Sequence, residues 1–106
     1  TIDWNGQQID GPTSKVMSLD NLRAKFEAFN WEVMEMEGND MDAVVAGLSQ
    51  AKAATGKGKP ICILMKTAMG KGVDFMEGSH EWHGIAPNDE QLAKALAQLP
   101  ETVGDY

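Results

Sequence analysis

The chain has 106 residues, of which 42% are hydrophobic, and carries a formal net charge of −7. This length suits one small hydrophobic core and is too short for two ordinary domains, so we expect a single domain over residues 1–106. The acidic balance argues against a nucleic-acid-binding surface, and no apolar stretch approaches the roughly 20 residues that cross a membrane.

The first predicted elements are a short strand and a helix. Ile2–Trp4 resembles the end of a strand, and a polar loop bounded by glycines follows it at Asn5–Gly11. Ser18 is of a residue type that caps helices, and apolar residues recur after it at helical spacing: Leu19, Leu22, Phe26 and Phe29. We expect a helix from this cap to Asn30 with one face buried. The chain opens without an initiator methionine, and we expect its visible start to lie inside a longer sequence.

The second half of the chain alternates between strands and helices. Trp31–Glu37 alternates apolar and acidic residues, which predicts a strand with one covered face near the edge of a sheet. Asn39 and Asp40 can cap a helix over residues 41–54, and the apolar run Ile61–Met65 predicts a buried strand. A last helix is expected from Asn88 to Leu99.

This order of elements favours an α/β fold in which helices flank a parallel sheet. Ligands in such folds bind beyond the carboxyl ends of the strands. The loop after Ile2–Trp4 and the glycine-rich loop Lys66–Val73 both follow predicted strands, so we expect them to share one rim. Both histidines, His80 and His83, follow the second loop within a short distance.

The candidate residues also have simpler interpretations. Asn5 precedes Gly6, and an Asn-Gly pair is typical of a tight turn. Each histidine could instead hold a loop in place through backbone hydrogen bonds. Cys62, the only cysteine, reads as a small buried apolar residue, and its isolation excludes an internal disulfide and favours a reducing, cytoplasmic setting.

Three segments together resemble the thiamine-diphosphate-binding domain of transketolase, and the similarity extends over nearly the whole chain. They are Trp4–Gly11, Lys66–Glu77 and Trp82–Asp89. The closest form is the split type, in which the N-terminal half is a separate subunit. The resemblance implies a partial thiamine-diphosphate-binding fold, truncated on its N-terminal side.

The resemblance implies a divalent metal site with two ligands in this chain. Asn5 corresponds to the terminal Asn of the family's metal motif, and the backbone carbonyl of Gln7 corresponds to a further ligand. Oxygen ligands suit Mg²⁺ or Ca²⁺. The Gly-Asp-Gly half of that motif does not occur in the sequence, so we expect the chain alone to bind metal diphosphate weakly and to lack activity.

The resemblance also implies cofactor-binding positions. His83 matches a histidine that faces the cofactor diphosphate and the substrate hydroxyl, where an imidazole can move a proton. Ile9 and Met69 match apolar walls of the thiazolium ring, although each could be an ordinary packing residue. Gly70 could present its amide to phosphate but reads first as loop geometry. His80 fits the family's spacing without an assigned step.

The implied function is part of a transketolase, which moves a two-carbon ketol unit between sugar phosphates of the pentose phosphate pathway. The expected partners are the C-terminal transketolase subunit or the remaining part of the domain, sugar phosphates, and a second copy in a homo-oligomer such as a dimer. No nucleic acid or membrane partner is expected. The alternative is a non-catalytic fragment or remnant of the fold that only self-associates.

Overall fold

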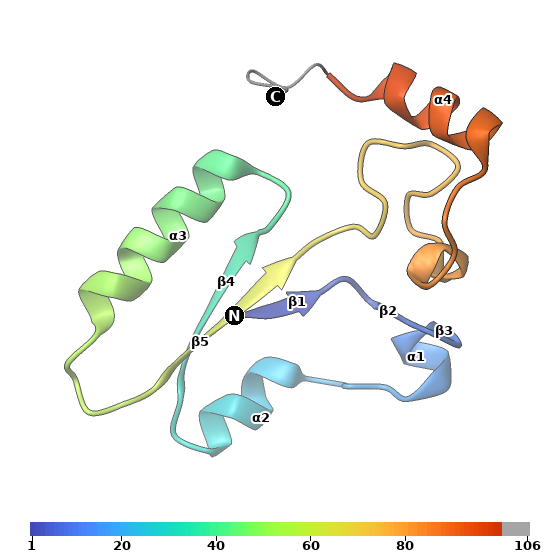
Figure 1. Ribbon diagram of the computed structural model, residues 1–106. Coiled ribbons are helices and arrows are strands. Elements are labelled where there is room, and N and C mark those ends of the chain that lie inside the picture. The colour runs from blue at the N-terminus through green and yellow to red at the C-terminus, as the bar shows by residue number, and fades with distance from the viewer. Residues whose placement is uncertain (101–106) are drawn as a thin grey trace.

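The computed structural model describes residues 1–100 as a small parallel sheet, a separate hairpin and several helices (Figure 1). The sheet contains β1 (Ile2–Trp4), β4 (Glu32–Glu37) and β5 (Ile61–Lys66), and the hairpin contains β2 (Gln7–Gln8) and β3 (Gly11–Pro12). The helical elements are α1 (Thr13–Val16), α2 (Leu22–Ala28), α3 (Met41–Ala54), the 3-10 turn η1 (His80–His83) and α4 (Asp89–Gln98).

The expected parallel α/β sheet is confirmed. The strand order is β1-β5-β4, and β5 pairs in parallel with both neighbours. The central position of β5 explains its continuous apolar sequence, because both of its faces are covered and Leu64 is fully buried. β4 has one strand neighbour within residues 1–100, which agrees with the edge position that its alternating sequence predicts.

Alternation along β4 places α2 and α3 on opposite faces of the sheet. Met36 is buried against Ala51 of α3 and Ile63 of β5. Arg23 of α2 donates hydrogen bonds of 2.9 Å to the carbonyl oxygen of Val33 and 2.8 Å to the carboxylate of Glu35. Since successive strand residues point to opposite faces, the α2 and α3 contacts lie on different sides.

The helix expected from Ser18 begins later, at Leu22. Ser18 Oγ instead donates a hydrogen bond of 2.8 Å to Asp20, and Asp20 adopts a left-handed backbone conformation with φ of 46°. Asn21 supplies the cap, because its side-chain oxygen accepts a hydrogen bond of 2.9 Å from the amide of Ala24. The helix ends at Ala28, ahead of the expected Asn30.

The starts of the other two predicted helices are confirmed. Asp40 caps α3 by accepting a hydrogen bond from the amide of Ala43 at 3.0 Å. Asn88 caps α4 through a reciprocal pair of hydrogen bonds with Gln91, each 2.9 Å long. Within residues 1–100, no helix combines the length and the apolar character that a bilayer crossing would need.

The molecule is flat, and it leaves much apolar surface exposed. Its extents are 51 × 37 × 17 Å and its radius of gyration is 16.8 Å, against about 13 Å for a compact domain of 100 residues. Three apolar side chains at helical spacing on α3 are exposed by 73%, 58% and 47%: Met41, Val45 and Leu48. Phe29, which directly follows α2, is 79% exposed and no residue of α2 is fully buried, so the expected burial of one helix face is only partial.

Candidate functional site

The carboxyl ends of the three parallel strands form a polar rim. Trp4 pairs with Lys66, so the loops after β1 and β5 start side by side. Thr67 Oγ1 donates a hydrogen bond to the carboxylate of Asp3, which joins these two loops. The amide of Ala68 donates a hydrogen bond of 2.7 Å to Asn39, the residue that precedes the cap of α3. Side chains therefore connect all three strand ends.

Asn5 forms a tight turn directly beyond β1. Its Oδ1 accepts a hydrogen bond of 2.8 Å from the amide of Gln7, and its Nδ2 donates one of 3.1 Å to Asp3. Gly6, which lies between Asn5 and Gln7, has a φ of 71°, a conformation that favours glycine. The Asn-Gly turn interpretation is thus correct locally, and it leaves the second lone pair of Asn5 Oδ1 for another partner.

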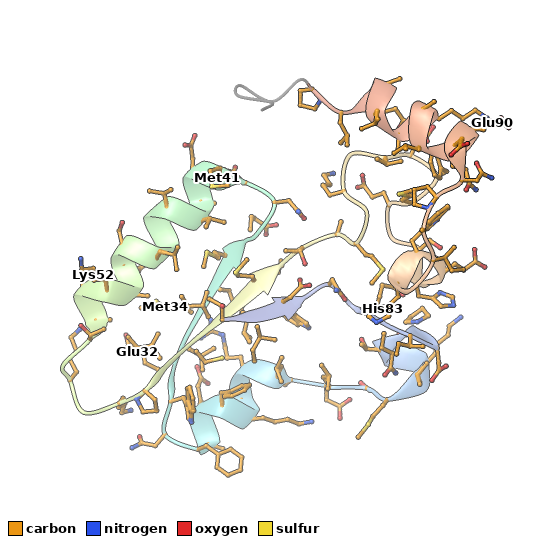
Figure 2. The ribbon with its side chains drawn as sticks, viewed as in Figure 1. Glu32, Met34, Met41, Lys52, His83 and Glu90 are labelled. Carbon is orange, nitrogen blue, oxygen red and sulfur yellow. The ribbon has the colours of Figure 1, made fainter. Side chains whose placement is uncertain are left out.

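The segment expected as a plain loop, Asn5–Gly11, contains the start of a hairpin that packs against η1. Strands β2 and β3 both contact this 3-10 turn. A cavity of about 540 Å³ lies at this contact, lined by Ile9, His80, Glu81, His83, Gly84 and Ile85. Figure 2 shows His83 beside the β3–α1 segment and far from α3. Two predicted site residues, Ile9 and His83, therefore line one cavity.

The other predicted site residues lie outside the lining of this cavity. Asn5 and Gln7 belong to the rim turn that leads into the hairpin. Met69 and Gly70 belong to the loop that follows β5. The amide of Gly78 donates a hydrogen bond of 2.8 Å to the carbonyl oxygen of Met69, which closes that loop.

Gly70 is required by the shape of this loop. Its φ is 67°, and a Cβ at this position would lie 2.6 Å from the carbonyl oxygen of Met76. No side chain fits at that distance without movement of the backbone. The sequence-based interpretation of Gly70 as loop geometry agrees with this contact.

Glu77 clamps the same loop from its far end. Its carboxylate accepts hydrogen bonds of 2.9 Å from Lys71 Nζ and 3.2 Å from the amide of Gly72. The bond from Lys71, followed by the one from Gly72, lowers the pKa of Glu77 below its usual value. Glu77 is therefore a loop-ordering acid.

Trp82 is a positioning residue that the sequence did not single out. Its indole nitrogen donates a hydrogen bond of 3.0 Å to the carbonyl oxygen of Phe75, and the two rings meet edge to face at 5.4 Å. Trp82 lies between His80 and His83 in η1. The contact thus attaches the histidine turn to the segment directly after the glycine-rich loop. A lone aromatic residue in a loop carries no periodic signal that would reveal this role.

The oxygen donors near the rim suit a hard divalent cation, as a partial ligand set. Asn5 Oδ1 has a free lone pair, and Gln7 Oε1 is buried without a hydrogen-bond partner in the part of the chain that the structure describes. Residues 1–100 contain no group of three His, Cys, Asp or Glu side chains that could hold a metal ion. A cation at this rim would therefore draw its remaining oxygens from other sources.

Comparison with known proteins matches the chain to a single family. Residues 1–101 match the family described as the thiamine diphosphate binding domain of transketolase. The chain is 38% identical over 102 residues to an apulose-4-phosphate transketolase subunit of Phocaeicola vulgatus, covering 96% of this chain and 36% of that protein. It is 39% identical over 97 residues to a 6-deoxy-6-sulfo-D-fructose transketolase subunit of Clostridium sp., covering 92% and 34%. It thus spans about a third of these relatives.

Solved structures have the same fold. The crystal structure of transketolase from Campylobacter jejuni superposes with a TM-score of 0.80 at 35% identity, over 91% of this chain and 15% of that one. Transketolase from Leishmania mexicana gives 0.72 at 29% identity, over 95% and 16%. The chain belongs to the transketolase family and corresponds to part of its thiamine-diphosphate-binding domain.

Proposed function

We propose that this chain supplies one half of a thiamine diphosphate site in a transketolase, which moves a two-carbon ketol unit between sugar phosphates. The observation that carries the proposal is the contact between the hairpin and η1. Through it the Asn5 turn leads directly to the cavity that Ile9 and His83 line. A ligand that spans rim and cavity would meet oxygen donors at one end and an imidazole at the other.

The proposed binding roles follow from the chemistry of each position. Asn5 Oδ1 and the backbone carbonyl of Gln7 would hold Mg²⁺, or Ca²⁺, which in turn would bind the diphosphate. The apolar side chain of Ile9 would contact the thiazolium ring from the hairpin, and that of Met69 would do so from the loop after β5. Gly70 would keep that loop in its observed shape, because a Cβ at this position would meet the backbone of Met76.

The proposed catalytic role belongs to His83. Thiamine diphosphate supplies a carbon nucleophile that adds to ketones and stabilises the charge left when a carbon–carbon bond breaks. His83 would exchange a proton with the substrate hydroxyl, since an imidazole can both donate and accept hydrogen bonds. Ile9 would limit the access of water to the reacting carbon. Trp82 would hold the turn that carries His83.

The proposed partners would complete the site. Two of the matched relatives are named as subunits of an apulose-4-phosphate transketolase, and this supports a separate C-terminal chain as the partner here. The exposed apolar side chains of α3 and the flat shape support further packing against the remaining part of the domain or a second copy.

We propose a cytoplasmic setting and a role in sugar phosphate metabolism such as the pentose phosphate pathway.

The test is a titration of the 15N-labelled chain with thiamine diphosphate, with and without Mg²⁺, followed by NMR. We expect metal-dependent shifts at Asn5, Gln7, Met69 and Gly70, even if binding is only millimolar. A His83→Ala variant should bind more weakly than a His80→Ala variant, which removes the other imidazole that lines the cavity. The absence of any shift at millimolar cofactor would favour a non-catalytic fragment.

Catalysis is tested separately by mixing the chain with the C-terminal half of a split-type transketolase. Ketol transfer between sugar phosphates that depends on both components would support the enzymatic role. Cofactor binding without transfer would restrict this chain to a binding role.

A further inference from the structure

Asp3 lies at the centre of the rim, although neither the composition nor the family motif draws attention to it. Its carboxylate accepts a hydrogen bond from Thr67 Oγ1 and a second one of 3.1 Å from Asn5 Nδ2. The same Asn5 side chain accepts a hydrogen bond of 2.8 Å from the amide of Gln7 through its Oδ1. Asn5 is thus held at both ends of its amide group.

The carboxylate of Asp3 determines which end of the Asn5 amide faces it. An ionised carboxylate only accepts hydrogen bonds, so the group opposite must be the NH₂ end of the amide. The carbonyl end is then directed away from Asp3. A flipped amide would place two oxygen acceptors against each other and would face the Gln7 amide with a second donor. Both neighbours therefore select a single orientation.

Thr67 fixes Asp3 in turn. The hydroxyl of Thr67 donates a hydrogen bond to the carboxylate of Asp3. The methyl carbon of Thr67 packs against Gly38, where an added Cβ would lie 2.5 Å from it. Gly38 follows β4, and its amide donates a hydrogen bond of 2.6 Å to the carbonyl oxygen of Lys66. The orientation of Asn5 is therefore determined by a chain of contacts that reaches the far strand of the sheet.

We propose that Asp3 is a positioning residue for the cation site, which directs the carbonyl oxygen of Asn5 toward the metal while making no metal contact itself. The inference rests on the proposed function, because that function makes Asn5 a metal ligand. The negative charge of Asp3 also favours a cation nearby. Partners that orient a ligand typically affect metal affinity about 10-fold or more.

The test compares four variants of the chain in the NMR titration with thiamine diphosphate and Mg²⁺. Asp3→Ala removes both carboxylate oxygens that accept hydrogen bonds. Asp3→Asn removes the charge and introduces an amide that can donate as well as accept. Thr67→Val removes only the hydroxyl. Asp10→Asn is the charge-matched control, because Asp10 lies in the hairpin turn and makes no side-chain hydrogen bond within residues 1–100. Spectral dispersion reports whether each variant folds.

Two readouts separate positioning from a merely structural effect. The first is the Asn5 side-chain amide resonance of the unliganded chain, which should shift in Asp3→Ala and in Asp3→Asn and stay in place in Asp10→Asn. The second is the factor by which Mg²⁺ increases the affinity for the cofactor. We expect this factor to be about 10-fold smaller in Asp3→Ala than in the unsubstituted chain, less reduced in Thr67→Val, and unchanged in Asp10→Asn.

Either of two results would overturn the positioning role alone: metal-dependent binding by folded Asp3→Ala equal to that of the unsubstituted chain, or an Asn5 amide resonance that stays in place in both Asp3 variants. Should Asp3→Ala fail to fold, Asp3→Asn and Thr67→Val carry the same comparison. A lack of metal-dependent binding by the unsubstituted chain would instead refute the proposed function, and the role of Asp3 with it.

Discussion

The indole nitrogen of Trp82 donates a hydrogen bond of 3.0 Å to the carbonyl oxygen of Phe75. This contact connects two segments that carry different parts of the candidate site, the 3-10 turn with both histidines and the long loop between β5 and that turn. The edge-to-face packing of the two rings adds to it. The position of the histidines therefore depends on a residue that has no chemical role of its own.

Replacement of Trp82 by Phe should lower the free energy of unfolding by about 1 kcal/mol, because a carbonyl oxygen loses its donor. The measurement is urea denaturation, with NMR of the His80 and His83 rings as a local report. Trp31→Phe is the control, since Trp31 also packs edge-on against a phenylalanine but makes no indole hydrogen bond within residues 1–100. Equal losses in the two variants would remove the special role of Trp82.

Replacement of Gly70 by Ala should destabilise the chain more than the same change at Gly58. Both glycines have positive φ, 67° and 77°, and each alanine would pay the cost of that conformation, about 1 kcal/mol. Only at Gly70 does the new Cβ also meet backbone, 2.6 Å from the Met76 carbonyl oxygen. Thermal unfolding of both variants measures the difference, and similar losses at the two sites would contradict the close contact.

The clamp formed by Glu77 predicts a pH dependence of stability. Its folded-state pKa is lowered, so its contribution is present above the unfolded pKa and is lost as the pH falls through the folded value. The unsubstituted chain should therefore be more stable than Glu77→Gln at neutral pH, and this advantage should vanish in acid below the usual carboxylate range.

Unfolding of both proteins by urea across the acidic range measures this effect. Glu37→Gln serves as the charge-matched control, because Glu37 forms no ion pair within residues 1–100. A Glu77→Gln difference that stays constant from neutral to acid would show that the clamp depends on shape and not on charge.

Sequence patterns sufficed for elements that have a clear period or a local cap. The alternation over β4 predicted an edge strand, and Asp40 and Asn88 cap α3 and α4 as expected. The hairpin was missed because Gln7 and Gln8 are polar and carry no pattern typical of a strand. The start of α2 was misplaced because Ser18 and Asn21 are both capping residue types, and only the hydrogen bond of Asn21 distinguishes them.

The candidate site was predictable only in part, for a similar reason. Parallel strands bring successive loops to one edge, so a shared rim followed from the order of elements. The meeting of Ile9 and His83 in one cavity depends on how the hairpin packs against η1, which no local pattern encodes. The roles of Asp3 and Trp82 arise from contacts with Thr67 and Phe75, residues whose types alone indicate nothing.

The hydrogen bond from Thr67 to Asp3 joins residues that are 64 positions apart in the sequence. During synthesis Asn5 leaves the ribosome well before Thr67, yet its surroundings exist only after β5 and Thr67 have followed. β4, α3 and β5 are consecutive and can form their contacts with each other beforehand, whereas β1 has to wait for β5. The rim is therefore assembled late, and a nascent chain released before Thr67 would display the turn of Asn5 without the side chain that steadies Asp3.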